Sequence, residues 1–442
     1  MDQKTEIESW GRVLKVPHEV AELHWMPQCL PPLEHAQSYL AFGEGRSYGD
    51  SCLNDSGLLL KSRKMNRFIA FDTVTGILRC EAGIRLDEIL NITISQGWFL
   101  PVVPGTQFVT LGGAIANDIH GKNHHVAGTL GCFVKQICVL RSDGLQYLCS
   151  PTENKDLFGA TIGGLGLTGL ILWAEIQMKP IQSSFIDQET IRYSSLDEFF
   201  KISKASESTH EYTVAWVDAL ASGYQLGRGH FIRGNHSKKS GQTKTKGLKV
   251  SVPVELPTWV LNQATVHCFN SLYFHRQVKK QQAKHIDYRP FFFPLDSIKN
   301  WNRLYGSRGF YQYQVVVPFE NDQEPIREIL KEVAKSKKAS FLAVLKTFGN
   351  VPSPGWLSFP RPGVTLALDF PNQGASTLRL FKTLDAIVRQ ARGALYPAKD
   401  ATMTAEDFEI YYPRWREFQA WIDPQFSSNF WRRVRPGAEK HG

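Results

Sequence analysis

The chain has 442 residues, enough for roughly two or three domains. Hydrophobic residues make up 42% and charged residues 21%, which is typical of a globular protein with a hydrophobic core and excludes a disordered, highly charged chain. The formal net charge of +9 favours an anionic ligand or an anionic surface as a partner.

Cysteine usage and the N-terminal residues indicate the compartment. The seven cysteines are scattered and form no CxxC pair, so we expect reduced thiols and no zinc site. The first eight residues are too polar for a signal peptide, and no apolar run is long enough for a transmembrane helix. We therefore expect a soluble cytoplasmic protein, in at most peripheral contact with a membrane.

The first functional motif in chain order is the glycine-rich loop at residues 43–50, which follows a short apolar run. Glycines 43, 45 and 49 can let consecutive backbone N–H groups face a phosphate, and Arg46 adds a cation at the centre. Tyr48 stands where the nicotinamide-binding fingerprint has its third glycine, so the loop is not that fingerprint. A plain surface turn is the alternative interpretation.

Local structure between this loop and residue 110 follows from periodicity and turn residues. Residues 68–82 predict a β-hairpin, and residues 86–94 predict an amphipathic helix that ends at Gly97. Residues 100–105 form a proline-framed turn that leads into the next motif.

Residues 110–125 are the most informative stretch of the sequence. Four small residues at 112, 113, 114 and 116 would let the backbone close on a flat or charged ligand. The run 117–125 is too polar for a core segment, because each buried polar group needs a partner. We expect one wall of a cofactor site here, with residues 43–50 as the other wall. A metal site from His120, His124 and His125 is an alternative, but no carboxylate pair completes it.

The following segment carries a second hairpin and a misleading motif. Residues 134–148, with Asp-Gly at the turn, predict a hairpin. Residues 164–169 match GxGxxG, but the apolar, strand-like run 170–178 follows where a Rossmann unit needs a helix.

The character of the chain changes near residue 183. Two basic segments, 236–250 and 275–285, flank the apolar, aromatic run 252–274. This pattern indicates either a solvated charged face beside a partly buried helix or a landing surface for an anionic membrane, and both interpretations stay open. The lysines lack interleaved aromatics, so we expect no nucleic-acid binding.

Strand and helix patterns alternate from 212 to 391, as in an α+β domain. We expect strands at 212–219, 229–232, 311–318, 341–348 and 365–370 and helices at 326–333 and 377–391. In the strand 311–318, Gln312 and Gln314 share one face, which is either a polar pocket wall or an exposed sheet face. Lys346 lies in the strand 341–348.

These motifs together resemble a known family. The segments 43–50, 104–106, 112–114 and 163–169 resemble the PCMH-type FAD-binding domain of the vanillyl-alcohol-oxidase superfamily. Within it, residues 120–125, 396–399, 423–424 and 426–428 resemble the decaprenylphosphoryl-β-D-ribose 2′-oxidase family. Each motif alone is weak, but their order and the run His-Gly-Lys-Asn-His-His are specific, and the likeness covers nearly the whole chain.

The resemblance implies an α+β architecture with a two-part FAD-binding domain. Residues 1–182 would form the FAD-binding domain, 183–392 an inserted substrate-binding domain built on an antiparallel sheet, and 393–442 a C-terminal segment that completes the FAD-binding domain. Covalent members of the superfamily carry a flavin-linked histidine in the first loop. This chain has Arg46 and no histidine there, so we expect noncovalent FAD. The residues that the resemblance places around FAD are Ala41, Gly43, Glu44, Gly45, Arg46, Ser47, Tyr48, Gly49, Asp50, Gly105, Thr110, Leu111, Gly112, Gly113, Asn117, Asp118, Ile119, His120, Leu170, Ile171 and Tyr396.

The implied reaction is FAD-dependent oxidation of the 2′-hydroxyl of a polyprenylphosphoryl-β-D-ribose to the 2′-keto sugar, the first half of an epimerisation to arabinose. The implied catalytic residues are Lys399, His120 and Tyr48, and the implied substrate-binding residues are Gln312, Gln314 and Lys346. Lys399 can stabilise developing negative charge, or act as a base if desolvation lowers its pKa, and we favour the first role. His120 as a purely structural histidine stays open.

The resemblance also implies partners. They are a polyprenyl-phosphate sugar as substrate, an NADH-dependent short-chain reductase for the second half of the epimerisation, and peripheral contact with an anionic inner membrane. Two alternatives stay open: an FAD-dependent sugar or aldonolactone oxidase with a soluble substrate, and a lipid-binding protein without turnover. The basic segments and the apolar run favour a lipid phosphate.

Overall fold

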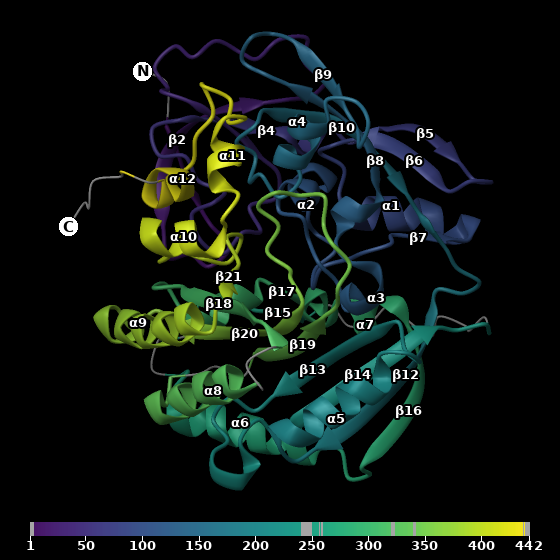
Figure 1. The fold of residues 1–442 in the computed structure, drawn as a ribbon, viewed down its shortest axis with the longest axis vertical. Helices are drawn as coiled ribbons and strands as arrows, with labels where there is room; N and C mark the ends of the chain where they lie inside the picture. Colours follow the sequence, from purple (N-terminus) through teal and green to yellow (C-terminus); the bar gives the residue numbers. More distant parts are fainter. Residues whose placement is uncertain are drawn as a thin grey trace.

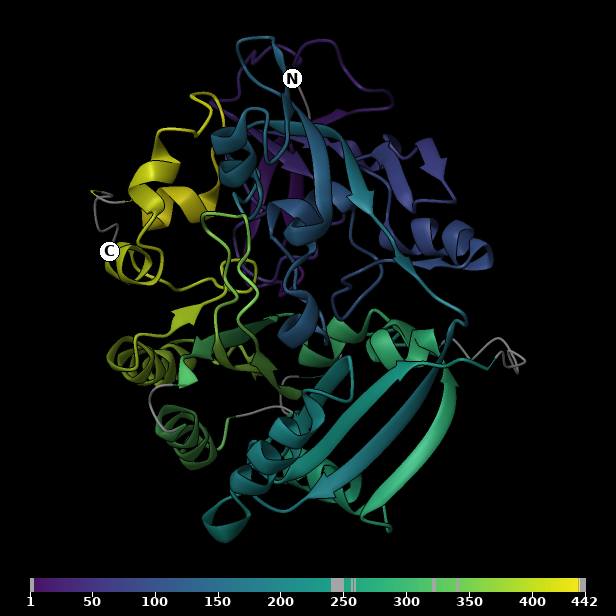
Figure 2. The ribbon, with the colours of Figure 1, turned by 45° about the vertical axis from the view of Figure 1, so that its right-hand side comes forward.

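The computed structural model describes residues 4–239, 250–255, 257, 260–319, 323–338, 342–435 and 437. In Figure 1 the N-terminal and C-terminal segments lie together in the upper half, and the middle of the chain forms a large sheet with helices in the lower half. The turned view in Figure 2 keeps the same two halves. The chain therefore passes from the upper half to the lower half and returns at its C-terminal end. The loop 349–362 also reaches into the upper half, where Ser353 and Ser358 donate hydrogen bonds to Asp118.

Two sheets build the N-terminal half. The first has the order β1 (Thr5–Glu8), β2 (Lys15–Glu22), β4 (Leu58–Lys61), β3 (Tyr39–Phe42), and the second has the order β5 (Phe68–Asp72), β6 (Ile77–Glu81), β10 (Leu170–Gln177), β8 (Val134–Leu140), β9 (Gln146–Cys149). A short pair joins β7 (Trp98–Phe99) to β11 (Lys179–Pro180). The helices here are α1 (Leu86–Thr93), α2 (Leu111–Ala116), α3 (His124–Ala127) and α4 (Lys155–Thr161).

The middle of the chain forms an eight-stranded sheet. Its order is β16 (Gln281–Asp287), β12 (Phe185–Tyr193), β14 (Gly229–His236), β13 (Tyr212–Val217), β19 (Ala343–Phe348), β20 (Gly363–Pro371), β18 (Phe310–Val317), β21 (Ala394–Leu395). Its neighbouring strands pair antiparallel throughout. The helices that accompany it are α5 (Leu196–Ser206), α6 (Gln263–His275), α7 (Tyr288–Phe292), α8 (Glu324–Ser336) and α9 (Ala375–Gln390).

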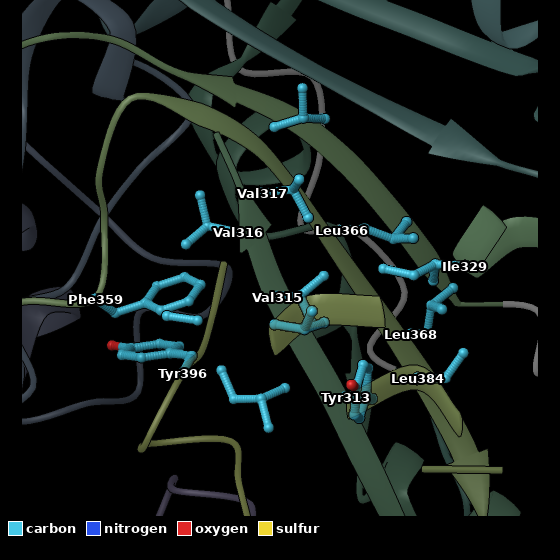
Figure 3. Packing of buried hydrophobic residues seen from close by; sticks show 14 of the residues in the cluster. Tyr313, Val315, Val316, Val317, Ile329, Phe359, Leu366, Leu368, Leu384 and Tyr396 are labelled. Carbon is cyan, nitrogen blue, oxygen red and sulfur yellow. The ribbon is translucent and has the colours of Figure 1, made fainter. Parts of the chain in front are cut away.

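Alternation along the strands gives this sheet two different faces. In β18, Tyr313, Val315 and Val317 are buried in a cluster with Ile329 of α8 and Leu384 of α9 (Figure 3). Gln312 and Gln314 of the same strand point to the opposite face, because successive residues of a strand alternate sides. One face is thus a packed core, and the other is free to line a cavity.

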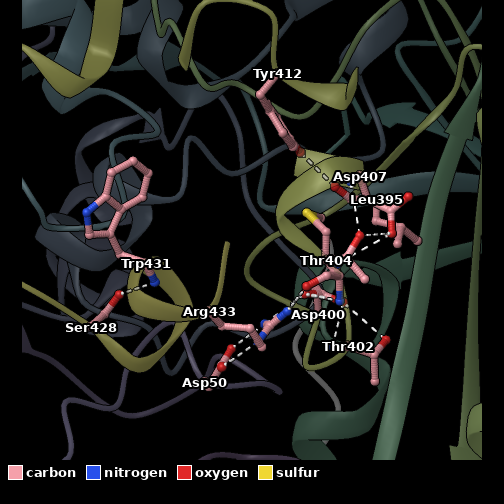
Figure 4. A network of polar contacts seen from close by, with 11 residues as sticks. Asp50, Leu395, Asp400, Thr402, Thr404, Asp407, Tyr412, Ser428, Trp431 and Arg433 are labelled. Atoms are coloured by element: carbon pink, nitrogen blue, oxygen red, sulfur yellow. Dashed lines mark hydrogen bonds and ion pairs between the residues drawn. The ribbon is translucent and has the colours of Figure 1, made fainter. Parts of the chain in front are cut away.

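The C-terminal segment folds back on the N-terminal sheets through α10 (Ala405–Tyr411), α11 (Trp415–Gln419) and α12 (Asn429–Val434). Tyr39 forms a parallel bridge with Phe426, and their rings lie 5.5 Å apart. Arg433 pairs with Asp50 at 2.7 Å and with Asp400 at 2.9 Å (Figure 4). These contacts fix the C-terminal segment against the glycine-rich loop.

Short elements complete the fold. The strands β15 (Val250–Ser251) and β17 (Ile298–Lys299) pair in parallel, and short 3-10 helices lie at Ser62–Lys64, Ile94–Gln96, Leu130–Phe133, Gly223–Gln225, Pro294–Ser297 and Trp301–Tyr305. No helix within the described ranges is long and apolar enough to cross a membrane.

The structure confirms the α+β class and most of the expected elements. The hairpins at 68–82 and 134–148, the helix from residue 86 and the strand from residue 170 are all present. Residues 240–249, most of the first basic segment, lie outside the described residues. The second basic segment includes a strand, because residues 281–287 pair along β12 as β16.

Candidate active site

One large cavity, of about 1380 Å³, lies between the N-terminal half and the non-core face of the eight-stranded sheet. Its walls come from residues 41–48, residues 103–122, the strands β13, β14, β18, β19 and β20, helix α6, and residues 396–399. Sites for a single small molecule usually measure about 300–1000 Å³, so this cavity has room for a large cofactor and a second ligand.

We call residues 41–48 and 103–122 together the first wall of the cavity. This wall needs glycine where its two backbone segments meet. A Cβ on Gly43 would collide with the side chain of Thr110, which caps α2 by accepting a hydrogen bond from the Gly113 N–H at 3.2 Å. Gly45 has φ +59°, a conformation that favours glycine. A Cβ on Gly105 would meet no atom within 4 Å, so this glycine borders open cavity.

Arg46 supplies a cation to the same wall. Its guanidinium carbon lies 4.1 Å from the centre of the Trp10 ring, and its Nε donates to the carbonyl oxygen of Phe108 at 3.3 Å. Neither partner neutralises the charge, so Arg46 stays available to an anion in the cavity.

His120 is buried where the first wall meets the sheet. Its Nε2 lies 3.1 Å from Nε2 of Gln314, and its Nδ1 has no hydrogen-bond partner among the described residues. Burial, together with the nearby ammonium of Lys346, holds the His120 pKa well below its ordinary value. We therefore treat His120 as a neutral imidazole with one ring nitrogen unpaired beside the cavity.

Lys399 reaches the cavity from the C-terminal segment. Its Nζ lies 3.7 Å from the centre of the Tyr48 ring. Burial lowers the Lys399 pKa to about 7, although the carboxylate of Asp369 acts in the opposite direction. Burial also raises the Tyr48 pKa well above its ordinary value, so the phenol is neutral. Lys399 can therefore change its protonation state near neutral pH.

Asp369 is the buried carboxylate behind this lysine. It accepts a hydrogen bond from Gln312 Nε2 at 2.6 Å and one from the Tyr305 hydroxyl at 3.3 Å. Burial raises its pKa to about 7. Sequence reasoning missed this residue, because its pairing with Gln312 depends on the register between β18 and β20, which are far apart in the chain.

Tyr396 joins the C-terminal segment to the polar stretch. Its hydroxyl donates to the carbonyl oxygen of Asn117 at 2.9 Å, and its ring stacks on Phe359 at 4.7 Å (Figure 3). The hydroxyl is therefore committed to the backbone, and the ring forms part of the cavity wall.

The cavity brings together most of the residues predicted for the site. Those that line it are Ala41, Gly43, Glu44, Gly45, Arg46, Ser47, Tyr48, Gly105, Thr110, Gly112, Gly113, Asn117, Ile119, His120, Ile171, Gln312, Gln314, Lys346, Tyr396 and Lys399. Lys122 also lines it and belongs to the polar run, yet sequence reasoning gave it no role. Five predicted residues lie behind the lining.

Two of these five belong to the glycine-rich loop. Gly49 packs against the backbone of Asp400 so closely that any Cβ would collide with its carbonyl. Asp50 pairs with Arg433. Both residues hold the loop in place from behind.

The other three residues point into the protein interior. Asp118 accepts hydrogen bonds from the Gly131 N–H at 2.9 Å and from Ser353 and Ser358 at 2.5 Å each. Leu111 and Leu170 belong to hydrophobic clusters and are 0% and 1% exposed. Residues 111–116 form a helix, so only one side of this stretch can face the cavity.

The three histidines of the alternative metal site have separate neighbours. The His124 ring lies 4.4 Å from the Phe348 ring, and His125 Nε2 lies 3.0 Å from the carbonyl oxygen of His210. Within the described part of the chain, no three histidine, cysteine or acidic side chains gather closely enough to hold a metal ion.

The residues present fit FAD. The cavity combines close-packed glycines, a guanidinium, an imidazole with an unpaired nitrogen, and an unpartnered buried Oδ1 of Asn117. A family model described as an FAD-binding domain matches residues 33–150, which include both segments of the first wall. The fold and the site thus define an FAD-binding protein.

Comparison with known proteins identifies the family. The chain is 37% identical over 422 residues to decaprenylphosphoryl-beta-D-ribose oxidase of Mycolicibacterium smegmatis, covering 91% of this chain and 90% of the relative. It therefore belongs to the decaprenylphosphoryl-β-D-ribose oxidase family, and the resemblance predicted from the motifs is confirmed.

Two further relatives extend the comparison. An uncharacterised protein of Streptomyces coelicolor is 30% identical over 372 residues, which is 79% of this chain and 100% of that protein. L-gulonolactone oxidase of Mus musculus is 30% identical over 168 residues, which is 37% of each chain. The likeness to the lactone oxidase is therefore partial.

Proposed function

We propose that this protein oxidises the 2′-hydroxyl of a polyprenylphosphoryl-β-D-ribose to the 2′-keto sugar, with noncovalent FAD as the electron acceptor. The observation that carries the proposal is the continuity of this cavity. The cavity joins the first wall to a sheet face that bears Gln312, Gln314 and Lys346. The whole-length likeness to the mycobacterial oxidase supports the same substrate class.

FAD, when bound, supplies the acceptor for the hydride that leaves the sugar carbon. The residues of this chain bind and orient the sugar and control its hydroxyl proton. Gln314 and the neutral His120 offer hydrogen-bonding groups for sugar hydroxyls at the edge of the first wall. Lys399, in its ammonium form, stabilises negative charge that develops on the substrate oxygen. Its neutral form, accessible near pH 7, can instead accept the hydroxyl proton.

The proposed domain division is 1–182 and 393–442 for FAD binding and 183–392 for the inserted substrate-binding domain. Contacts between Arg433 and Asp50, and between Phe426 and Tyr39, support a joint N-terminal and C-terminal unit. Arg46 in the first loop, where covalent members carry histidine, supports noncovalent FAD. Acid denaturation would then release all flavin into the supernatant, and flavin that stayed with the precipitate would contradict this binding mode.

The proposed partners follow from the reaction. The keto product needs a reductase to complete an epimerisation, and we propose an NADH-dependent short-chain enzyme. The exposed cations Arg276 and Lys284, which line the cavity, support peripheral contact with an anionic membrane at the cytoplasmic side. Flotation with anionic liposomes at low and high salt tests that contact, and salt-insensitive behaviour would contradict it.

Anaerobic flavin absorbance tests the function itself. Addition of polyprenylphosphoryl-β-D-ribose to the yellow protein should bleach the visible flavin band, because reduced flavin loses that absorbance. An unchanged spectrum with this substrate, together with bleaching by a soluble sugar or aldonolactone, would instead identify an oxidase with a soluble substrate. Protein that is purified colourless and fails to take up FAD would refute both versions.

A further inference from the structure

The cavity carries far more positive than negative charge. Eight lysines and arginines line it, against two carboxylates. Both carboxylates already have partners: Glu44 pairs with Arg63 at 2.9 Å, and Asp296 accepts from the Gln107 N–H at 2.9 Å. Arg276, Lys284 and Lys299 are exposed, and Arg85 pairs with Asp87 at 2.8 Å. Lys122 and Lys346, in contrast, are desolvated by burial, and a desolvated cation is costly unless a ligand supplies an anion.

Lys122 and Lys346 form a pair of cations inside this cavity. Lys122 Nζ donates one hydrogen bond, to the carbonyl oxygen of Phe292 at 3.0 Å, which leaves two of its N–H groups for a ligand. For Lys346 Nζ, no hydrogen bond or ion pair is found within the described ranges. Burial lowers the Lys122 pKa to about 7 and that of Lys346 to about 8, and the charge of Lys346 contributes to the shift at Lys122.

The fold places these two lysines beside each other. The backbone carbonyl of Lys122 accepts a hydrogen bond from Thr213 at 2.8 Å, at the start of β13. The pairing of Ala215 with Leu345 and of Trp216 with Val344 sets that start of β13 beside Lys346 in β19. The charge of Lys346 also lowers the pKa of Lys399, so Lys346 lies within electrostatic reach of both other lysines.

The sheet face under the cavity changes from polar to apolar across these lysines. Gln314 and Thr365 lie on the side of His120 and Lys399. On the other side the lining residues are Val214 of β13 and Ile232 of β14, which pair directly. One end of a bound ligand would thus contact polar side chains of the sheet, and the other end would contact apolar side chains.

Helix α6 covers the apolar end. Val266, Phe269 and Tyr273 line the cavity from this helix, and the Tyr273 ring lies 4.6 Å from the Trp216 ring. The apolar end is therefore bounded by the sheet below and by an aromatic helix face above. An extended hydrocarbon chain fits such a passage.

We propose that Lys122 and Lys346 together hold the phosphodiester of the substrate, and that the prenyl chain leaves over Val214 and Ile232 beneath α6. This inference rests on the proposed function. The chemistry supports the placement: the reacting 2′-hydroxyl sits on the carbon next to the one that bears the phosphate. The phosphate-binding cations must therefore border the catalytic lysine, as Lys346 does.

The two lysines then determine specificity as well as position. A phosphodiester carries one negative charge and compensates desolvated ammonium groups by Coulomb attraction and charge-assisted hydrogen bonds. A neutral sugar or lactone would leave both cations uncompensated in the closed site. The pair therefore selects a sugar phosphodiester over neutral sugars of the same size.

The test compares two probes that differ in the phosphate: farnesylphosphoryl-β-D-ribose and farnesyl β-D-ribofuranoside. Steady-state turnover is measured for the wild type and for Lys122→Met and Lys346→Met, with flavin content and melting temperature to verify folding. We expect KM for the phosphodiester to rise roughly 10- to 100-fold in each variant, with kcat little changed. KM for the ribofuranoside should stay within about twofold of the wild type.

Matched variants complete the design. Lys204→Met removes an exposed lysine from α5, on the core face of the sheet, and should leave both KM values unchanged. Lys122→Arg keeps a cation and should restore most of the affinity. If Lys122→Met fails to fold, Lys346→Met carries the test, because its removal orphans no hydrogen-bond acceptor found in the described residues.

The outcomes separate the two claims. If the wild type turns over farnesylphosphoryl-β-D-ribose but the lysine variants keep its KM, or lose affinity equally for both probes, the phosphate site is refuted and the proposed function stands. If the wild type turns over neither probe, the proposed function fails as well. A selective loss for the phosphodiester, rescued by Lys122→Arg, establishes the site.

Discussion

The Nζ atom of Lys399 lies 3.7 Å from the centre of the Tyr48 ring, so a lysine of the C-terminal segment contacts the face of an aromatic side chain from the first glycine-rich loop. An aromatic face attracts an ammonium group without neutralising it as a carboxylate would. The lysine keeps its hydrogen-bond donors available to the cavity. The contact also makes the site depend on the docking of two segments that are about 350 residues apart in the sequence.

Replacing Lys399 by Met should reduce kcat by roughly 10²- to 10³-fold, which is typical for the loss of one group that stabilises transition-state charge. FAD should remain bound, because the close-packed first wall is intact. Lys382→Met, at an exposed position of α9, is the control and should keep wild-type kcat. Turnover in the Lys399 variant equal to that of the control would remove this lysine from the mechanism.

Replacing Asp369 by Asn should shift the pH dependence of kcat. The Asp369 carboxylate raises the Lys399 pKa, so its loss moves that pKa below about 7. If the ammonium form is active, activity falls as pH rises through this pKa, and the fall begins at lower pH in the variant. A pH profile from 5 to about 9 measures the shift.

Asp385→Asn provides the matched control for this experiment. Asp385 is also a buried carboxyl with its pKa raised to about 7, and it accepts a hydrogen bond from the Tyr313 hydroxyl at 2.7 Å. It lies on the core face of the sheet, away from the cavity. An identical pH shift in both variants would attribute the effect to general destabilisation. A rising limb that shifts to lower pH in Asp369→Asn would favour Lys399 as the base.

Local pattern predicted much of this site, and nonlocal pairing explains what it missed. The period of a strand sufficed to place Gln312 and Gln314 on one face, and small residues sufficed to indicate close packing at Gly43 and Gly112. Asp369 acquires its role only through the register of β18 against β20. Lys122 becomes notable only because Lys346, more than 200 residues away, lies nearby.

Leu111 and Asp118, which we predict to bind FAD, do not line the cavity, and the reason is local. Leu111 and Asp118 were included because they lie within an otherwise informative run. In the structure, residues 111–116 are helical, so Leu111 faces the core, and Asp118 turns away to accept three hydrogen bonds. Motif membership therefore indicates which segment borders the cavity but does not determine which of its side chains line it.

Replacing Arg433 by Met should destabilise the protein by about 3–5 kcal/mol, because it leaves the buried carboxylates of Asp50 and Asp400 facing each other without a cation. FAD affinity should fall as well, since these residues support the first wall and the segment of Lys399 (Figure 4). Thermal unfolding and flavin retention during gel filtration measure the two effects. Arg435→Met, at an exposed position just after α12, should change neither, and equal losses in both variants would contradict the argument.

Replacing Lys346 by Met should raise the melting temperature of the ligand-free protein while it weakens substrate binding. Burial lowers the Lys346 pKa from 10.5 to about 8, so the folded state holds this proton less tightly than the unfolded state. The resulting cost to stability is complete below about pH 8 and disappears as pH rises toward 10.5. The advantage of Met should therefore be largest at pH 7 and small near pH 10.

Thermal unfolding of wild type and Lys346→Met at pH 7 and pH 10 tests this prediction. The exposed Lys382→Met variant should match the wild type at both pH values, because a solvated lysine has the same environment in both states. A gain at pH 7 that vanishes at pH 10 would show that stability is given up at this position to keep a desolvated cation in the cavity. A loss of stability at pH 7 would mean instead that the ammonium group makes favourable contacts in the ligand-free protein. That result would count against Lys346 as part of a binding site for an anionic ligand.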